Sequence, residues 1–265
     1  MVKQIDISIL GLGNLGTAFF EGLRLNNDVN LYLYEQNEQT RKSLLELYDV
    51  EVLPNIDTID SGTLILCIKP QNIKDFFKSF SNKIGENTLI CSPVAGLEID
   101  TISKHVKNKI IRIMPNLLIR DNNGFIPFVK NYDGDYLNFI DVALSSLGNT
   151  EEFDEELFAL ITAISGSGPA WFYELSNQLV NSATKLGMNE KDATNLIKGL
   201  IKALPNLINE EDTFNELVNK VKSTKGTTEA GLNSLNNDYF DKIIFNAIQQ
   251  ATNRSIEIST ELKNE

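Results

Sequence analysis

The chain has 265 residues, of which 42% are hydrophobic, and this composition fits one large or two modest globular domains. Its formal net charge of −12 argues against nucleic acid or an anionic membrane as a partner, because both would repel it. An anionic small substrate would need a local positive site of backbone amides or a few placed side chains. The sequence starts without a signal-peptide pattern, and no apolar run reaches the ~18 residues of a membrane span, so we expect a cytoplasmic protein.

The N-terminal part alternates between strand-like and helix-like patterns. Strands are expected at residues 5–10, 29–34, 63–68, 88–92 and 109–114, and helices at residues 17–25, 38–48, 73–80 and 100–106. Alternation at this spacing predicts βαβ units in one doubly wound parallel sheet. The sequence therefore indicates an α/β fold class, with a Rossmann-type dinucleotide-binding domain over residues 1–150.

Strand-like runs almost disappear after Gly148. Helices are expected at residues 169–186, 190–208, 213–221, 229–235 and 239–262, with Gly187 ending the first and Asn189 capping the second. This pattern predicts an all-α domain over residues 151–265 that completes the substrate site. Its broad apolar faces favour pairing with a second copy, in a homodimer or a higher homo-oligomer of dimers.

A glycine-rich motif joins the first strand to the first helix, and in this context it indicates dinucleotide binding. Gly11 permits the tight turn, Gly13 lets a pyrophosphate approach the backbone, and Gly16 lets helix and strand pack closely. Asn14 and Leu15 lie at the start of the helix, whose free amides would face the phosphates.

Glu35 ends the second strand, about 20 residues after the glycines, where an acidic residue accepts hydrogen bonds from the ribose of NAD. Its charge would repel the 2′-phosphate of NADP, so the cofactor is expected to be NAD(H) or NADP(H), with NAD(H) favoured. Two alternatives stay open: Arg41 could serve a phosphate, and Glu35 could be an exposed loop residue.

The single histidine, His105, lies in a Lys- and Asn-rich stretch and is expected at the surface. This removes the histidine acid/base of many hydroxyacid dehydrogenases and the Ser/His/Asp triad. Cys67 and Cys91 lie in apolar runs and are expected to be buried free thiols, with no metal site. Reduction of a protonated imine fits this inventory, because such a substrate already carries the electrophilic charge.

A turn rich in small polar residues, 221–232, opens one of the C-terminal helices. The hydroxyls of Ser223, Thr227 and Thr228 and the amides around Gly226 could hold a carboxylate with the help of the helix dipole. The alternative is ordinary N-capping, with Thr227 as the cap, which would explain one hydroxyl residue but not the cluster.

Several segments together make the chain resemble the pyrroline-5-carboxylate reductase family over nearly its whole length. They are residues 11–16, Ile68-Lys69-Pro70-Gln71, Ala95-Gly96, Arg112-Ile113-Met114-Pro115-Asn116, 165–170, 223–232 and 251–255. The resemblance implies a Rossmann domain, a helical dimerisation domain and hydride transfer from NAD(P)H to a cyclic imine, giving proline.

The same resemblance implies roles for individual residues. Thr228 would hydrogen-bond the ring nitrogen, while Ser223, Gly226 and Thr227 would bind the carboxylate, with Glu211 as a secondary polar contact. The cofactor would be lined by Asn55, Lys69, Pro70, Ala95 and Asn116.

The sequence departs from the family at two places. The family usually has Ser-Pro-Gly-Gly-Thr-Thr where this chain has Lys225 in place of a turn glycine, and Leu117 replaces a threonine after Asn116. Two other functions therefore stay open. One is a non-catalytic paralogue that binds the dinucleotide, and the other is a β-hydroxyacid dehydrogenase, although residues 171–184 lack the lysine that such an enzyme needs.

Overall fold

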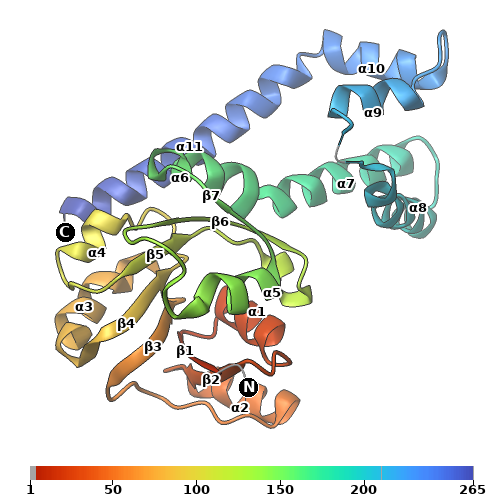
Figure 1. The fold of residues 1–265 in the computed structure, drawn as a ribbon. Coiled ribbons are helices and arrows are strands. Elements are labelled where there is room, and N and C mark those ends of the chain that lie inside the picture. The colour runs from red at the N-terminus through yellow and green to blue at the C-terminus, as the bar shows by residue number, and fades with distance from the viewer. Residues whose placement is uncertain (1–3, 210, 265) are drawn as a thin grey trace. The chain divides into compact units, whose positions relative to one another are not determined.

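The computed structural model describes residues 4–209 and 211–264, and its first part contains a seven-stranded sheet (Figure 1). The strands lie in the order β2-β1-β3-β4-β5-β6-β7. Their bounds are β1 Ile5–Leu10, β2 Val29–Tyr34, β3 Ile59–Leu66, β4 Ile84–Ser92, β5 Ile110–Ile113, β6 Gly124–Lys130 and β7 Gly148–Glu152. The helices are α1 Asn14–Leu23, α2 Glu38–Tyr48, α3 Ile73–Phe80, α4 Ile99–Ser103, α5 Ser145–Leu147, α6 Phe158–Ile161, α7 Gly168–Lys185, α8 Glu190–Ala203, α9 Phe214–Val221, α10 Thr227–Asn237 and α11 Phe240–Asn264.

The first five strands are parallel and alternate with helices, so the α/β fold class is confirmed. The chain runs from β1 to β2 on one side and then crosses to β3 on the other, which makes β1/β3 the switch point of the sheet. In open α/β sheets, ligands bind outside the carboxyl ends of the strands at such a point. The glycine motif follows β1 directly at this position.

Two strands differ from the sequence-based expectation. Strand β6 pairs antiparallel with β5, because the ten residues between them are too few for the crossover that a parallel pair requires. Strand β7 then pairs parallel with β6 along residues 148–152, so one short strand that the sequence pattern did not indicate begins at Gly148, after which the described residues contain no further strand. The sheet is therefore mostly, not wholly, parallel.

Apolar side chains cover both faces of the sheet, as a doubly wound fold requires. On one face, α1 buries Phe19, Phe20 and Leu23 against β1 and the 139–147 segment. On the other face, α3 contributes Ile73 and Phe77, and α4 contributes Ile99 and Ile102. The two cores fix the strand ends that carry the candidate site.

Contacts divide the chain into two compact units, one of Met1–Gly168 with Gln250–Glu265 and one of Pro169–Gln249. The boundary expected at residue 150 lies inside the first unit. The end of α11 also belongs to this unit, because its residues Ile258 and Ser259 pack against Gly96, where a Cβ atom would come within 2.7 Å and 2.8 Å of them.

The described residues of the second unit form helices joined by turns and loops, with no strand. Gly187 has φ +101° after α7, and the Asn189 side chain accepts a hydrogen bond from the Lys191 amide, as expected of a helix end and a cap. Helix α8 ends at Ala203, short of the expected residue 208, because Pro205 cannot continue the helical hydrogen bonds.

Among the described residues of this helical unit, Ala193 alone is buried. Large apolar side chains are exposed on several of its helices, among them Phe172, Leu186, Phe214 and Phe245. Such faces mark an association surface, because a soluble monomer rarely exposes apolar patches of this extent.

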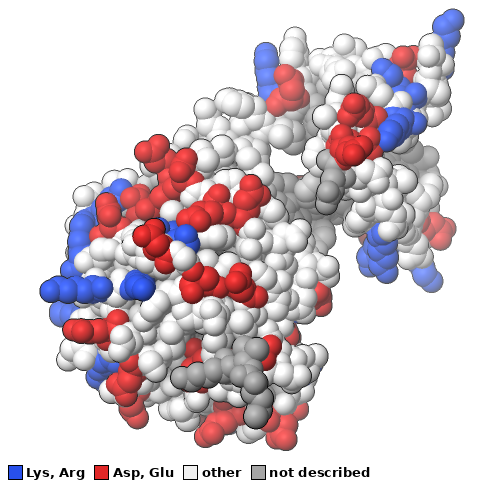
Figure 2. All heavy atoms as spheres, viewed as in Figure 1, with Lys and Arg blue, Asp and Glu red and all other residues white. Residues whose placement is uncertain are grey.

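In the part of the chain that the structure describes, no helix is both long and apolar enough to cross a membrane. Acidic side chains are spread over much of the face seen in Figure 2, in keeping with the net charge of −12.

Candidate active site

The glycine loop after β1 has a backbone that larger residues could not adopt. Gly11 has φ +89°, and a Cβ atom there would lie 2.6 Å from the carbonyl oxygen of Cys67. A Cβ atom on Gly16 would lie 1.9 Å from the carbonyl oxygen of Gly11. Both glycines are therefore required by close approach of α1 and β3 to the loop.

Gly13 differs from its two neighbours because a Cβ atom there would meet nothing within 4 Å. It is the N-cap of α1, and since it has no side chain, no capping hydrogen bond occupies the first amides of the helix. The first amides of α1 and the open space at Gly13 together form the kind of helix terminus that binds a phosphate group.

The Glu35 carboxylate holds the glycine loop in place. Its Oε2 accepts a hydrogen bond of 2.7 Å from the Leu12 amide, and its Oε1 accepts one of 2.7 Å from the Asn37 amide. Arg41 Nη1 donates to the carbonyl oxygens of Glu35 and Gln36, at 2.8 Å and 2.7 Å. An ionised carboxylate has about four acceptor positions, so Glu35 retains capacity for a ribose hydroxyl.

A cavity of about 600 Å³ opens beside this loop. Five of the residues expected at a cofactor line it: Gly11, Gly13, Glu35, Asn55 and Lys69. A further wall of the cavity, which the sequence patterns did not indicate, comes from α3 and the turn before it and consists of Asn72, Asp75, Phe76, Ser79 and Phe80. The helical spacing of 72, 75–76 and 79–80 is the signal that could have indicated this wall.

Other expected cofactor residues lie at the ends of neighbouring strands but outside this cavity. Pro70 begins a short 3₁₀ helix after β3, and Ala95 follows β4. Asn116 follows β5, where its side chain accepts a hydrogen bond of 3.1 Å from the Leu118 amide. Their contact with a cofactor stays a prediction.

In the helical unit, the turn before α10 is tightly folded around Gly226. The Gly226 amide donates to the Ser223 carbonyl oxygen at 3.0 Å, and a Cβ atom on Gly226 would lie 2.2 Å from the Ser223 hydroxyl. The Lys225 amide donates to the Glu229 carboxylate at 2.7 Å. Ser223 and Gly226 are thus held side by side.

The N-cap of α10 is Gly226, and it makes no side-chain capping bond. The alternative that Thr227 caps this helix is therefore wrong, since Thr227 is the first residue of the helix. Thr228 follows in the same turn and is partly buried. An uncapped helix start beside Ser223 and Thr228 combines amide donors, hydroxyls and a positive dipole end, which suits a carboxylate. Glu211 lies in an exposed turn before α9.

Of the remaining reactive side chains, His105 and Cys91 are placed as expected, whereas Cys67 is half-buried and lines the dinucleotide cavity. His105 is exposed and stacks on Phe77, with ring centroids 5.0 Å apart. Cys67 and Cys91 are free, and burial raises the pKa of both thiols, which keeps them protonated.

Comparison with known proteins adds the decisive observation. A pyrroline-5-carboxylate reductase of Staphylococcus epidermidis is 30% identical over 260 residues, which covers 94% of this chain and 96% of that protein. Its counterpart in Staphylococcus haemolyticus is 31% identical over the same coverage. The chain belongs to the pyrroline-5-carboxylate reductase family.

Further matches agree with this family. Residues 155–258 match the family described as pyrroline-5-carboxylate reductase dimerisation, and residues 6–96 match NADP oxidoreductase coenzyme F420-dependent. The fold superimposes on a Plasmodium falciparum pyrroline carboxylate reductase with NADP bound, with a TM-score of 0.84, 22% identity, and coverage of 98% of this chain and 100% of that one. A Streptococcus pyogenes 1-pyrroline-5-carboxylate reductase gives a TM-score of 0.82 at 22% identity, covering 96% and 99%.

In this member of the pyrroline-5-carboxylate reductase family, the lysine that replaces a turn glycine keeps a glycine-like backbone angle. Lys225 has φ +59°, in the left-handed region that glycine adopts without steric cost. Lys225→Gly is expected to raise the free energy of unfolding by about 1 kcal/mol, the order of the left-handed penalty that it removes. Chemical denaturation measures this change.

Lys222→Gly provides the control, because Lys222 lies three residues earlier with an ordinary φ of −78°. There a glycine relieves no strain and only loosens the unfolded chain, so the control variant is expected to lose stability. Equal effects of the two substitutions would show that Lys225 is not strained.

Proposed function

We propose that the protein reduces the cyclic imine 1-pyrroline-5-carboxylate to L-proline with a nicotinamide cofactor. The observation that carries the proposal is the uncapped start of α10 beside Ser223 and Thr228, in a chain 30% and 31% identical to two proteins named pyrroline-5-carboxylate reductase. The family-level function and the local chemistry point to the same kind of substrate, a small carboxylate.

The cofactor half of the reaction is assigned to the β1/β3 switch point. The residues there fit a dinucleotide. Gly13 leaves open space at the start of α1, and as a glycine N-cap it has no side chain that could occupy the first amides of the helix. We assign pyrophosphate binding to the amides at Gly13, Asn14 and Leu15, and ribose binding to Glu35. When bound, the cofactor supplies the hydride.

The substrate half is assigned to residues 223–228. The Ser223 hydroxyl and the amides at Gly226 and Thr227 would bind the carboxylate, and the Thr228 hydroxyl would accept a hydrogen bond from the protonated ring nitrogen. The iminium carbon is already electrophilic, so the protein needs to orient it and exclude water but need not supply a strong acid. The exposed position of His105 agrees with such a mechanism.

We also propose that the working assembly is a homodimer or an oligomer of dimers. The match to the dimerisation family covers residues 155–258, and the helical unit buries only Ala193 among its described residues. A second copy of this unit offers the same apolar side chains, which is the self-complementary surface that a twofold interface requires.

The activity is tested with purified protein and NADH or NADPH by following absorbance at the nicotinamide band. We expect the protein to oxidise NADH or NADPH when pyrroline-5-carboxylate is present. We expect no oxidation of either cofactor with a 2-methyl-3-keto acid. Turnover of the keto acid alone would indicate a β-hydroxyacid dehydrogenase. Cofactor binding without turnover of any imine or ketone would indicate a non-catalytic paralogue.

We propose NAD(H) as the preferred cofactor, because the Glu35 carboxylate is fixed at the loop and Arg41 is engaged with backbone carbonyl oxygens. Glu35→Gln is expected to raise the ratio of kcat/KM for NADPH over NADH about tenfold, the order of one removed charge repulsion near the surface. Initial rates with both cofactors measure the ratio.

The matched control for this change is Glu46→Gln, which removes the same charge from an exposed position on α2. It should leave the cofactor ratio unchanged. If Glu35→Gln also left the ratio unchanged, Glu35 would not select the cofactor.

A further inference from the structure

The loop between β4 and α4 turns tightly around Ala95. The two residues before Ala95 and the two after it are buried, whereas Ala95 itself is partly exposed. The Leu97 amide donates to the Val94 carbonyl oxygen at 3.2 Å, and Gly96 between them has φ +75°, as the third residue of a type II turn requires. Ala95 therefore lies at the corner of the turn, at the carboxyl end of β4.

This turn lies on the path of the nicotinamide half of a dinucleotide. With the pyrophosphate assigned to Gly13 and a ribose to Glu35, the dinucleotide cavity and its α3 wall hold the adenosine half. The other half extends from the pyrophosphate along the carboxyl ends of the strands. Strand β4 lies beside β3 in the sheet, so its loop is the next wall that this half reaches.

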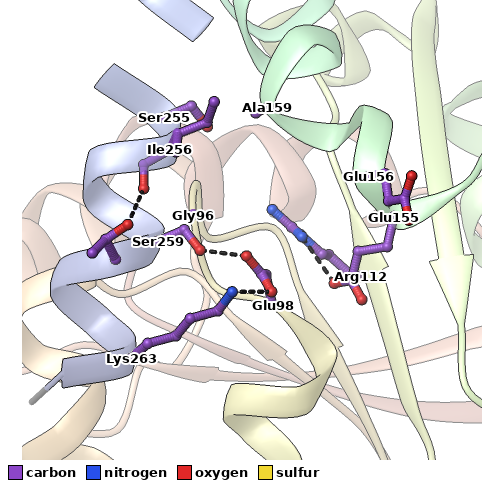
Figure 3. Close-up of a pocket in the computed structure, with 11 residues that line it drawn as sticks. Gly96, Glu98, Arg112, Glu155, Glu156, Ala159, Ser255, Ile256, Ser259 and Lys263 are labelled. Atoms are coloured by element: carbon purple, nitrogen blue, oxygen red, sulfur yellow. Dashed lines mark hydrogen bonds and ion pairs between the residues drawn. The ribbon is translucent and has the colours of Figure 1, made fainter. Parts of the chain in front are cut away.

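The end of α11 packs against the buried side of the turn (Figure 3). A Cβ atom on Gly96 would lie 2.7 Å from Ile258 Cγ2 and 2.8 Å from the Ser259 amide nitrogen, both too close for a side chain. A glycine is thus required here for its positive φ and for the approach of the helix. The contact forms one wall of a cavity of about 300 Å³ that Arg112 and Ser255 also line.

Glu98 joins the other end of the turn to the same helix. Its carboxylate accepts a hydrogen bond from the Ser259 hydroxyl and pairs with Lys263 Nζ at 2.7 Å, as the dashed lines in Figure 3 show. Burial acts to raise the pKa of Glu98, but the hydrogen bonds from Lys263 and Ser259 outweigh it and hold this pKa below its usual range. Glu98 is therefore ionised, and hydrogen bonds to an ionised group are stronger than neutral ones.

We propose that Ser259 and Lys263 are positioning residues for the cofactor, which act through Glu98 and Gly96 to hold the turn at Ala95 in place for the nicotinamide ring. The inference rests on the proposed function and adds to it a role for the end of α11, which lies 161 residues after Glu98. A turn that is already ordered costs less free energy to bind than a mobile one. In the described part of the chain, none of these residues lines the dinucleotide cavity, so their effect should be confined to the nicotinamide half.

The test compares the affinities of the full chain for NADH and for ADP-ribose, which lacks the nicotinamide ring. Calorimetric titration of the wild-type protein should show tighter binding of NADH. Ser259→Ala should weaken NADH binding about tenfold, the effect of one hydrogen bond to a charged group, and leave ADP-ribose binding within about twofold. Thr260→Val is the matched control, because its hydroxyl donates to the Ile256 carbonyl oxygen of its own helix at 3.0 Å. It should change neither affinity.

Lys263 gives a second test that includes a rescue. Lys263→Met keeps the length of the side chain but removes its charge, and it should weaken NADH binding about threefold, since a partly exposed ion pair contributes less than a buried hydrogen bond. Lys263→Arg restores the charge and should return NADH affinity to the wild-type value.

Three results would overturn the proposal. Equal losses of NADH and ADP-ribose affinity in Ser259→Ala would mean that the end of α11 supports only the fold, and unchanged affinities would mean that the turn needs no support. Wild-type protein that bound ADP-ribose as tightly as NADH would mean that the turn does not meet the nicotinamide ring. A protein that passes these binding tests but reduces no imine would instead refute the proposed reaction and leave this inference standing.

Discussion

Thr228→Val should lower kcat for imine reduction about 100-fold, because a preorganised hydrogen bond to a reacting group contributes at least this much in other active sites. The Thr228 hydroxyl lies in the first turn of α10, and valine keeps the shape of the side chain while removing its hydrogen bond. The affinity for NADH should stay within about twofold, since nothing in the dinucleotide cavity changes. Steady-state kinetics and cofactor titration measure the two quantities.

Thr184→Val is the matched control, because its hydroxyl donates only to the Val180 carbonyl oxygen of its own helix, at 3.0 Å. It should keep wild-type turnover. A Thr228→Val variant with full activity would remove this hydroxyl from the chemistry. A variant that loses NADH affinity instead would mean that the turn serves the cofactor.

Gly13→Ala should lose cofactor affinity and Gly16→Ala should lose stability, although the two glycines lie three residues apart in one segment. A Cβ atom on Gly13 meets open space, so this variant should keep its melting temperature but bind the dinucleotide at least about tenfold more weakly, because the methyl group occupies the phosphate position. A Cβ atom on Gly16 would lie 1.9 Å from a backbone oxygen, so this variant should lose more than about 3 kcal/mol of stability.

Thermal unfolding and cofactor titration of both variants separate the two effects. Normal cofactor affinity in Gly13→Ala would place the pyrophosphate elsewhere. A Gly16→Ala variant as stable as the wild type would show that helix α1 can shift away from β1 at no cost.

The features that could be predicted from the sequence are those encoded by neighbouring residues. The glycine loop, β1 and β2 depend on local patterns, and the strands lie at the expected residues 5–10 and 29–34. The turn at residues 223–228 could also be predicted, because its small polar residues are close together in the sequence. Its cap was not, since the choice of Gly226 over Thr227 depends on backbone angles that the sequence does not display.

The strands at the far edge of the sheet could not be predicted in the same way. Strand β6 contains Pro127, which lacks an amide donor and ordinarily argues against a strand. Strand β7 reads Gly-Asn-Thr-Glu-Glu, with no apolar alternation. Both are strands because a partner strand satisfies their backbone, and that partner is distant in sequence for β7.

The cavity lined by Arg112 and Ser255 could not be predicted from the sequence either, because these two residues lie more than 140 positions apart. Helical periodicity indicated the helix that carries Ser255, but not that its end returns to the nucleotide-binding unit. That return depends on Gly96, whose missing side chain admits Ile258 and Ser259. The Glu98 contacts with Ser259 and Lys263 then hold the helix there.

The first unit is thus discontinuous, and the order of its pieces matters during synthesis. The segment that packs on Gly96, residues 250–264, leaves the ribosome after the whole of 169–249 has been made. A nascent chain can fold its sheet early, since domains generally fold as they emerge. The surface around Gly96 and Arg112 stays uncovered until residues 250–264 have been made, so the first unit cannot be completed before the whole of the helical unit has been synthesised.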